Sequence, residues 1–431
     1  MTPTTPRRSL GLLELIAMGV GGMIGGGIFS VLGLAVGITG HAAPLAFLVG
    51  ALIALAGGYS YVRLALTFRN DGASFTYLER AFPAQPNIAN ITGWTVIIGY
   101  VGTLALYAFT FGAYGADLLG QADKPALRMA LSAAVLLFFL IVNLKSALTS
   151  GHTEDLIVYA KILLLGVFAV AGVTTLQVDH LTPVYDKGAP SVFMAGALIF
   201  VAYEGFQLIT NAVHETRHPD RNIPLGIYGS IIITSLIYIT LAVVAIGNLD
   251  TADLISAEEY ALAAAAKPVL GEAGTILVGI AALLATSSAI NATVFGAARM
   301  MAEMATQTRM PHVLAKRNEA DVPWVANVVL ITMALIFTLT GGLEVIAAFS
   351  SMTFLLVSIG VSTANLRLKS ETNCKIPLVI LGLSLMSVTV ILLIVYLWRD
   401  KPDILISIIG IYGAVIASEL LAIARVRKKI R

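Results

Sequence analysis

The chain has 431 residues, of which 58% are hydrophobic and 12% are charged, and its mean hydropathy is +0.88. This composition excludes a soluble multidomain protein and indicates an all-α polytopic membrane protein. The formal net charge of +2 gives no sign of a nucleic-acid partner, and the single cysteine, Cys374, excludes an internal disulfide framework.

Twelve apolar runs are candidates for helices that cross a lipid bilayer. They cover residues 10–38, 42–66, 88–117, 127–148, 155–175, 190–213, 223–247, 272–302, 325–341, 344–366, 376–398 and 403–424. If the N-terminus is cytosolic, twenty Lys and Arg residues near the run ends fall on the cytosolic side and six fall outside. Because cations flanking membrane spans stay in the cytosol, we expect a plasma-membrane protein with both termini cytoplasmic.

The first run contains six glycines within residues 19–27. Glycine loses the most backbone entropy on ordering, so this density predicts local unwinding of the helix. Unwound backbone within a membrane survives only where it lines a cavity or contacts a ligand. The alternative is a seam of small residues for close helix packing, since Gly19, Gly22 and Gly26 approximate that spacing.

Two connecting segments suggest internal symmetry. Residues 73–82 place apolar side chains on one helical face, as an interfacial helix would. Residues 256–259 resemble a capping box that begins a short outer helix. Each insertion follows the second helix of a five-helix set, and a second set of five must start from the opposite side of the membrane. We therefore expect inverted five-helix repeats at 10–175 and 190–367, with two peripheral helices at 375–425.

An inverted repeat requires the sixth run to be interrupted like the first. Near its middle, Glu204 precedes Gly205. A charged residue at this depth costs on the order of 2.5–3.5 kcal/mol unless it is protonated, paired or facing water. Glu204 is either a neutral carboxyl bonded to a neighbouring carbonyl or a group that binds a ligand or a proton.

Four separated motifs, in order, resemble the amino acid–polyamine–organocation transporter superfamily, and within it the archaeal proton-coupled, broad-specificity amino acid transporters. They are the segment 9–81 with Met23-Ile24-Gly25-Gly26-Gly27-Ile28-Phe29, the core at 202–206, the loop at 218–224 and the segment 287–293. The resemblance implies a five-plus-five inverted-repeat (LeuT-like) fold with twelve transmembrane helices, in which helices one and six are discontinuous at the substrate site.

The interrupted helices provide groups for an amino acid. Free N–H groups at a half-helix N-terminus suit the substrate carboxylate, and unpaired carbonyls suit its ammonium group. The carboxylate is expected at Gly25, Gly26 and Gly27, where the family often has a hydroxyl residue in place of Gly26. The other expected substrate-binding residues are Met23, Ile24, Val201, Ala202, Tyr203, Glu204, Tyr100 and Asn291.

Lys161, in the run 155–175, is the second residue whose charge would cost free energy inside the membrane. It lies close enough to the cytosolic end for its long side chain to reach water, which is one interpretation. In the similar proton-coupled transporters, a lysine here replaces the coupling sodium ion of related carriers. The resemblance implies partners near Gly19 in helix one and at Ser287 and Ser288 in helix eight. Burial disfavours the charged ammonium, so such a lysine can release its proton near neutral pH.

These features predict a secondary transporter of amino acids, by proton symport and alternating access, with no cofactor and no catalytic or metal site. The predicted partners are a small amino acid, a proton and the lipid bilayer. An exchanger of cationic amino acids or polyamines is the alternative within the same class. A substrate sensor that no longer transports and a membrane-embedded enzyme are the alternatives from other classes, and the absence of paired catalytic groups counts against the enzyme.

Overall fold

The computed structural model describes residues 10–69, 73–145, 151–307 and 309–414. Within these ranges the regular structure is helical, apart from one isolated bridge between Leu10 and Thr216. This bridge joins the start of the first helix to the segment after the sixth run, where Arg217 N donates to Leu10 O at 2.8 Å. The all-helical prediction is confirmed for the described residues.

The long helices follow the apolar runs. They are α1 (Leu12–Met23), α2 (Gly27–Thr39), α3 (Ala43–Phe68), α5 (Pro86–Leu118), α6 (Pro125–Lys145), α7 (Gly151–Thr174), α8 (Ala189–Leu198), α10 (Pro219–Asn248), α13 (Glu272–Thr306), α14 (Trp324–Thr340), α15 (Leu343–Arg367), α17 (Ile376–Asp400) and a last helix at Pro402–Ala414. The shorter elements are η1 (Gly40–Ala42), α4 (Ala73–Ala81), η2 (Val178–Leu181), η3 (Ile199–Gln207), α9 (Leu208–Asn211), α11 (Thr251–Ala257), η4 (Glu258–Tyr260), α12 (Ala261–Leu270), η5 (His312–Ala315) and α16 (Lys369–Thr372).

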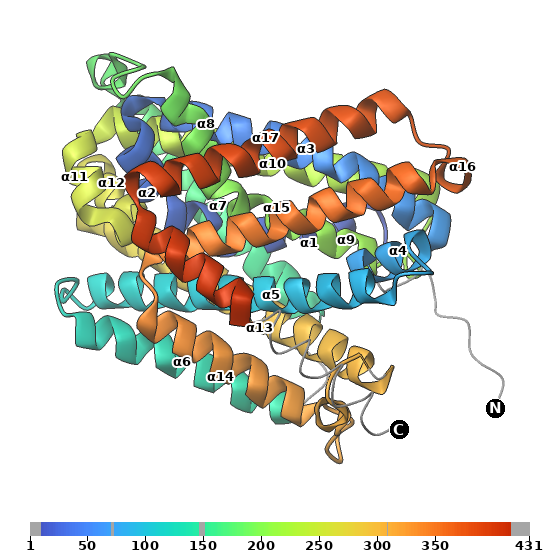
Figure 1. The fold of residues 1–431 in the computed structure, drawn as a ribbon. Coiled ribbons are helices and arrows are strands. Elements are labelled where there is room, and N and C mark those ends of the chain that lie inside the picture. The colour runs from blue at the N-terminus through green and yellow to red at the C-terminus, as the bar shows by residue number, and fades with distance from the viewer. Residues whose placement is uncertain (1–9, 70–72, 146–150, 308, 415–431) are drawn as a thin grey trace.

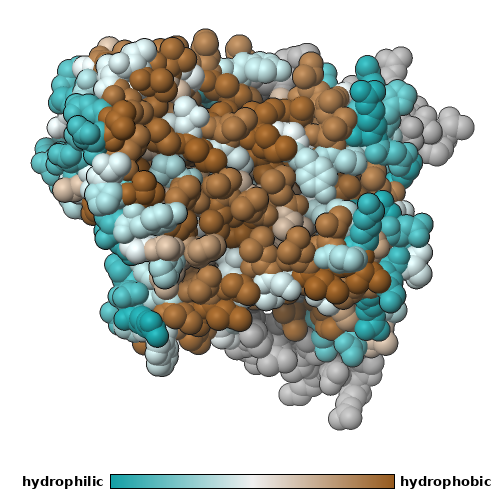
Figure 2. Space-filling view, turned by 90° about the horizontal axis from the view of Figure 1, so that it is seen from above, coloured by the Kyte–Doolittle hydropathy of each residue, from teal (hydrophilic) through white to brown (hydrophobic). Residues whose placement is uncertain are grey.

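The long helices form a bundle with distinct ends. In Figure 1, α4 and α16 lie at one end and α11 and α12 at the other. Figure 2 shows apolar side chains over the middle of the surface and polar side chains gathered at both ends. Among the described residues, nine helices are long and apolar enough to cross a membrane, with Gly27–Phe68 counted as one, and three shorter apolar helices accompany them. The chain is therefore an integral membrane protein, because an apolar belt between polar rims matches a bilayer.

The first apolar run is divided in two. Helix α1 ends at Met23, α2 begins at Gly27, and Ile24–Gly26 forms a turn between them. Packing of small residues, the alternative interpretation, is also present, because a side chain at Gly22 would meet the backbone of Gly205. The glycines therefore both interrupt the helix and let it approach the sixth run closely.

The sixth run is interrupted by a different means. Its middle is the nine-residue 3-10 helix η3, which lies between α8 and α9. In a 3-10 helix, side chains three residues apart lie directly above one another. Ala202 and Gly205 face the broken first helix, where Ala202 meets Gly27 and Gly205 meets Gly22. Tyr203 and Phe206 share a second face and pack against α3.

The two connecting segments, at residues 73–82 and after residue 256, contain helices as expected. The second helix begins at a different residue from the predicted one. In α4, Phe75 and Leu78 are buried within the protein, so this apolar face packs against the bundle. The capping box predicted at Ser256 is wrong. Ser256 lies inside α11 and its hydroxyl donates to Asp253 O at 2.9 Å, whereas α12 begins only at Ala261. Glu258 has a positive φ of 26° between the two helices, so the chain turns sharply where we expected a helix start.

Candidate functional site

A small cavity lies in the middle of the bundle, against both interrupted runs. Its volume is about 60 Å³. Its walls come from α1, α5, η3, α9, α13 and α15. The lining residues are Met18, Gly21, Gly22, Tyr100, Thr103, Tyr107, Glu204, Gly205, Gln207, Leu208, Ser288, Ala289, Ala292, Thr293 and Phe354.

The cavity adjoins a larger vestibule at one end of the bundle. A vestibule of about 670 Å³ shares Tyr100, Gln207, Leu208, Ala292 and Thr293 with it. This vestibule extends past α4 and the last turns of α13. A small molecule in the cavity is therefore connected to the end of the bundle that carries α4.

The opposite end is closed by contacts across α2. A methyl group at Gly33 would collide with the backbone of Glu258, so η4 lies directly on α2. Arg128 Nη1 pairs with Glu259 Oε1 at 3.0 Å, which holds η4 to the start of α6. Burial, and then the Glu259 and Glu344 carboxylates, raise the pKa of the Glu258 carboxyl.

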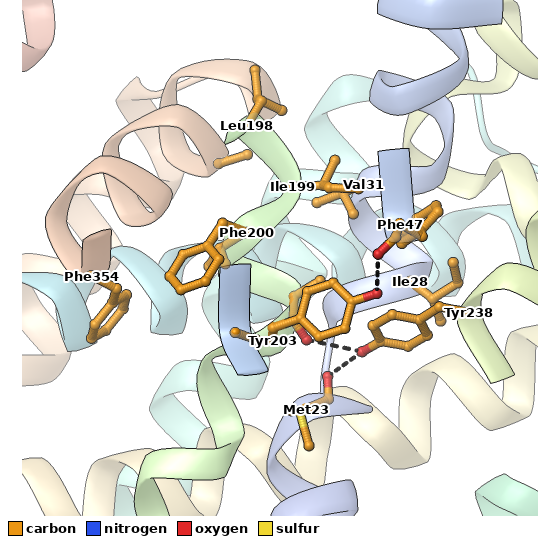
Figure 3. Packing of buried hydrophobic residues seen from close by; sticks show 14 of the residues in the cluster. Met23, Ile28, Val31, Phe47, Leu198, Ile199, Phe200, Tyr203, Tyr238 and Phe354 are labelled. Carbon is orange, nitrogen blue, oxygen red and sulfur yellow. Dashed lines mark hydrogen bonds between the residues drawn. The ribbon is translucent and has the colours of Figure 1, made fainter. Parts of the chain in front are cut away.

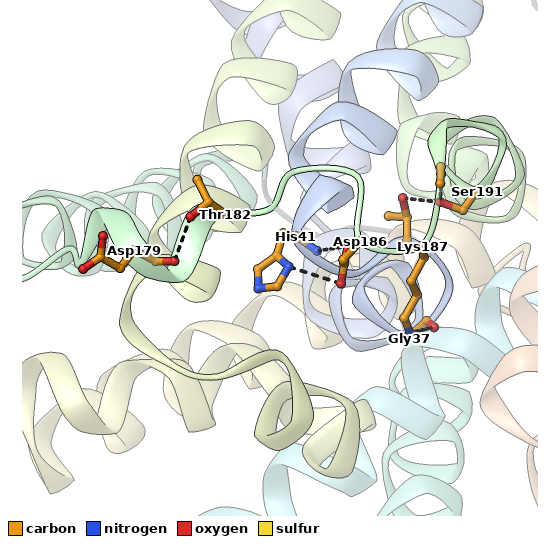
Figure 4. Close-up of polar contacts among 9 residues, drawn as sticks. Gly37, His41, Asp179, Thr182, Asp186, Lys187 and Ser191 are labelled. Carbon is orange, nitrogen blue, oxygen red and sulfur yellow. Dashed lines mark hydrogen bonds and ion pairs between the residues drawn. The ribbon is translucent and has the colours of Figure 1, made fainter.

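The loop between η2 and α8 adds further contacts at the closed end. Figure 4 shows the imidazole of His41 beside the carboxylate of Asp186, with Nδ1 and Oδ2 3.2 Å apart. Lys187 Nζ donates to Gly37 O at 2.6 Å, near the end of α2. These polar contacts fasten this loop to the end of α2 and to η1.

Tyr238 of α10 connects the two interruptions. Its hydroxyl lies 2.6 Å from Met23 O and 3.1 Å from Ala202 O, as Figure 3 shows. Both carbonyls were expected to be unpaired and ready for an ammonium group. In this conformation the single O–H of the phenol lies within hydrogen-bonding distance of both carbonyls, so neither lacks a nearby donor.

The remaining residues of the first interruption are packed rather than open. Ile24 is fully buried, and side chains at Gly25 and Gly26 would meet Ala289 and Tyr107 respectively. Gly27 begins α2 with no side-chain hydrogen bond at its N-cap. The cavity reaches Gly21 and Gly22 instead, about one turn toward the vestibule.

Two predicted wall residues point elsewhere. Tyr203 donates its hydroxyl to Phe47 O at 2.7 Å and packs edge to face on Tyr238 (Figure 3). Asn291 accepts from Asn143 Nδ2 of α6 at 3.0 Å, on the other side of α13 from the cavity. Neither residue lines the cavity. Tyr100 and Glu204 do line the cavity.

Val201 is held by its backbone. Its N–H donates to Ser351 Oγ of α15 at 2.9 Å, and the same hydroxyl donates to Leu198 O. Ser351 therefore bridges the end of α8 to η3, at the place where the sixth run changes from one helix type to the other.

Lys161 is fully buried between α7 and α1. Its Nζ donates to Gly21 O at 2.9 Å, and Gly21 is a wall residue of the cavity. The carbonyl partner is thus Gly21, two residues after the predicted Gly19. A Cβ atom added at Gly19 would instead meet Ser230 and Ile209. Ser288 lines the cavity, and Ser287 precedes it on α13.

The sequence interpretation missed several wall residues. Thr103, Tyr107, Gln207, Thr293 and Phe354 give no signal individually, because hydroxyl and aromatic residues are common in membrane helices. Among the described residues, no group of three or more His, Cys, Asp and Glu side chains is placed to hold a metal ion.

Replacing Tyr238 by phenylalanine tests the connection between the interruptions. We expect the variant to unfold more readily by about 1–3 kcal/mol, because two buried carbonyls lose their shared donor. Thermal unfolding of the purified protein in detergent measures this. The matched control is Tyr228→Phe, the same change on a partly exposed tyrosine of α10. Equal losses in the two variants would show that the phenol does not hold the interruptions together.

A helical membrane protein whose two interrupted helices border a cavity joined to one end has the architecture of a carrier for small molecules. The comparisons with known proteins agree with this class. A family model for amino acid permeases matches residues 10–423, and the chain belongs to this family, within the amino acid–polyamine–organocation superfamily.

Individual relatives cover most of the chain. An uncharacterized protein of Methanocaldococcus jannaschii is 30% identical over 421 residues, which are 96% of this chain and 95% of that protein. An inner membrane transport protein of Escherichia coli is 28% identical over 404 residues, 94% of each chain. A branched-chain amino acid permease of Bacillus subtilis is 25% identical over 342 residues, 74% of this chain and 72% of that permease.

Proposed function

We propose that the protein carries amino acids across the membrane by proton-coupled symport, with access to the central cavity alternating between the two sides. The family supports amino acids as the substrate class. The observation that carries proton coupling is the buried Lys161, hydrogen-bonded to the cavity wall at Gly21. Exchange of amino acids remains the competing mode of transport.

In this proposal, protonation of Lys161 is linked to the position of α1. A charged ammonium makes a stronger hydrogen bond to Gly21 O than a neutral amine does. The protonated lysine therefore holds the inner half of the first run against α7. Loss of the proton weakens this contact and biases the carrier toward another arrangement.

We also propose twelve crossings, with both termini in the cytosol and the end that carries α4 on the cytosolic side. The distribution of Lys and Arg supports this orientation. The vestibule then faces the cytosol, and the contacts of α2 with η4 close the outside. The structure corresponds to an inward-facing carrier under this proposal.

Cysteine labelling tests the orientation. After removal of the native Cys374, Asp220→Cys and Glu272→Cys are a matched pair, since about three quarters of each native side chain is exposed, 76% and 75%. We expect an impermeant maleimide added to intact cells to label the cysteine at 272 and to reach the cysteine at 220 only after permeabilisation. Labelling of the cysteine at 220 in intact cells would contradict the proposed orientation.

Transport itself is tested with purified protein in proteoliposomes. We expect an inward proton gradient to drive accumulation of labelled amino acids without sodium, and a protonophore to abolish it. Uptake that requires an amino acid inside the vesicles and ignores the proton gradient would show exchange instead. Absence of uptake under every condition would reject transport and favour a sensor.

A further inference from the structure

Two polar side chains of η3 project into the cavity from the same face. Glu204 and Gln207 are three residues apart in a 3-10 helix, where such side chains lie one above the other. Both line the cavity, and Gln207 also lines the vestibule. Glu204 therefore lies deeper, and Gln207 lies at the entrance.

Both side chains are buried, yet one polar atom of each lacks a partner. Glu204 is 8% exposed and Gln207 is 9% exposed. Among the described residues, Glu204 Oε2 and Gln207 Nε2 have no hydrogen-bond partner. Native proteins leave few buried polar atoms unpaired, so each one calls for an explanation, and these two are the ones that lie on the cavity.

Apart from Glu204, the cavity wall contains no charged side chain among the described residues: within this part of the chain, no Lys, Arg, Asp or second Glu lines the cavity. Beside the pair, the wall consists of hydroxyl residues such as Thr103 and Thr293 and apolar residues such as Leu208 and Phe354. The pair therefore provides the most polar part of the cavity.

The two unpaired atoms have complementary chemistry. A carboxyl oxygen accepts a hydrogen bond and an amide nitrogen donates one. A ligand group satisfies both only if it carries a donor and an acceptor together, as a hydroxyl or a primary amide does. An ammonium group offers donors alone, and an aliphatic group offers neither.

We propose that Glu204 and Gln207 read the substrate side chain and select amino acids with an uncharged hydroxyl or amide over aliphatic amino acids of the same size. This inference rests on the proposed transport of amino acids. Serine, threonine, asparagine and glutamine are the members of this substrate class. An aliphatic side chain would leave both polar atoms unpaired in the closed carrier, and a site that hydrogen-bonds a substrate group discriminates against analogues that lack it.

Threonine and valine are the sharpest test because they differ by a hydroxyl in place of a methyl group. In proteoliposomes, we expect wild-type protein to prefer threonine over valine by about tenfold or more in the ratio of maximal rate to half-saturation concentration. In Gln207→Leu and in Glu204→Leu the preference should fall to about twofold or less. The preference is the ratio of the two substrates within one variant, so the overall rate of each variant does not enter the comparison.

Two further variants support the comparison. Glu204→Gln keeps the size and an acceptor oxygen, so we expect it to retain the threonine preference. Thr363→Val makes a polar-to-apolar change on the exposed face of α15 and should match wild type. If Glu204→Leu fails to fold, Gln207→Leu decides alone, because its residue lies at the entrance of the cavity.

The outcomes separate this inference from the proposed function. Equal use of threonine and valine by wild-type protein would overturn the selection and leave transport standing. Preferred uptake of lysine, lost selectively in Glu204→Gln, would also overturn it and assign Glu204 to a cationic side chain. Absence of uptake of every amino acid would reject the proposed function and this inference with it.

Discussion

Replacing Gly205 by alanine is expected to abolish transport. A methyl group there would collide with the backbone nitrogen of Met23 and with Gly22, and backbone atoms cannot turn aside as a flexible side chain can. Overpacking of a well-packed interior typically costs about 1–3 kcal/mol, and here the strain falls between the two interrupted helices. We expect loss of uptake in proteoliposomes, together with a lower unfolding temperature.

The control for this variant is Gly166→Ala on α7, where an added methyl group meets nothing within 4 Å. It should keep wild-type uptake and stability. If Gly205→Ala transports as well as Gly166→Ala, then the close packing of η3 on α1 is not required for the transport cycle.

Replacing Lys161 by alanine is expected to eliminate proton-driven uptake. The substitution removes the Nζ group that donates to Gly21 O and leaves a cavity at a fully buried position. Large-to-small substitutions at buried positions cost about 2–5 kcal/mol. Lys161→Met separates charge from volume, because it fills most of the same space without an ammonium group. Both variants should lose uptake driven by a proton gradient, whereas only the alanine variant should unfold much more readily.

Lys267→Met is the matched control, since this lysine pairs with Glu272 at the surface and its side chain is 63% exposed. Its uptake should respond to external pH as wild type does, rising as the pH falls. Full proton-driven uptake by Lys161→Met would show that the lysine does not carry the proton, and Glu204 would be the next residue to replace.

The first interruption could be predicted from the sequence because glycine acts locally. Six glycines between residues 19 and 27 destabilise a helix whatever surrounds them, and the turn falls at Ile24–Gly26. Glu204 and Lys161 could likewise be detected from the sequence, because a titratable side chain in an apolar run is costly and is usually retained for a function. One lies on the cavity and the other donates to its wall.

The orientation of side chains around the second interruption could not be predicted in the same way. Residues 199–207 contain a single glycine, and the sequence does not show that they adopt a helix of three residues per turn. With that period, Tyr203 turns to α3 and Gln207 turns to the cavity. The hydrogen bonds of the Tyr238 hydroxyl to Met23 O and Ala202 O join three elements far apart in the chain, so no local sequence pattern predicts them.

The most direct test of proton-coupled amino acid transport is the flow of protons during amino acid entry. Proteoliposomes containing the purified protein and a trapped pH-sensitive dye are given a saturating mixture of amino acids at equal internal and external pH. The account predicts that the lumen acidifies as amino acids enter, in wild type and Lys267→Met and not in Lys161→Met. Amino acid entry without acidification of the lumen in wild type would contradict it.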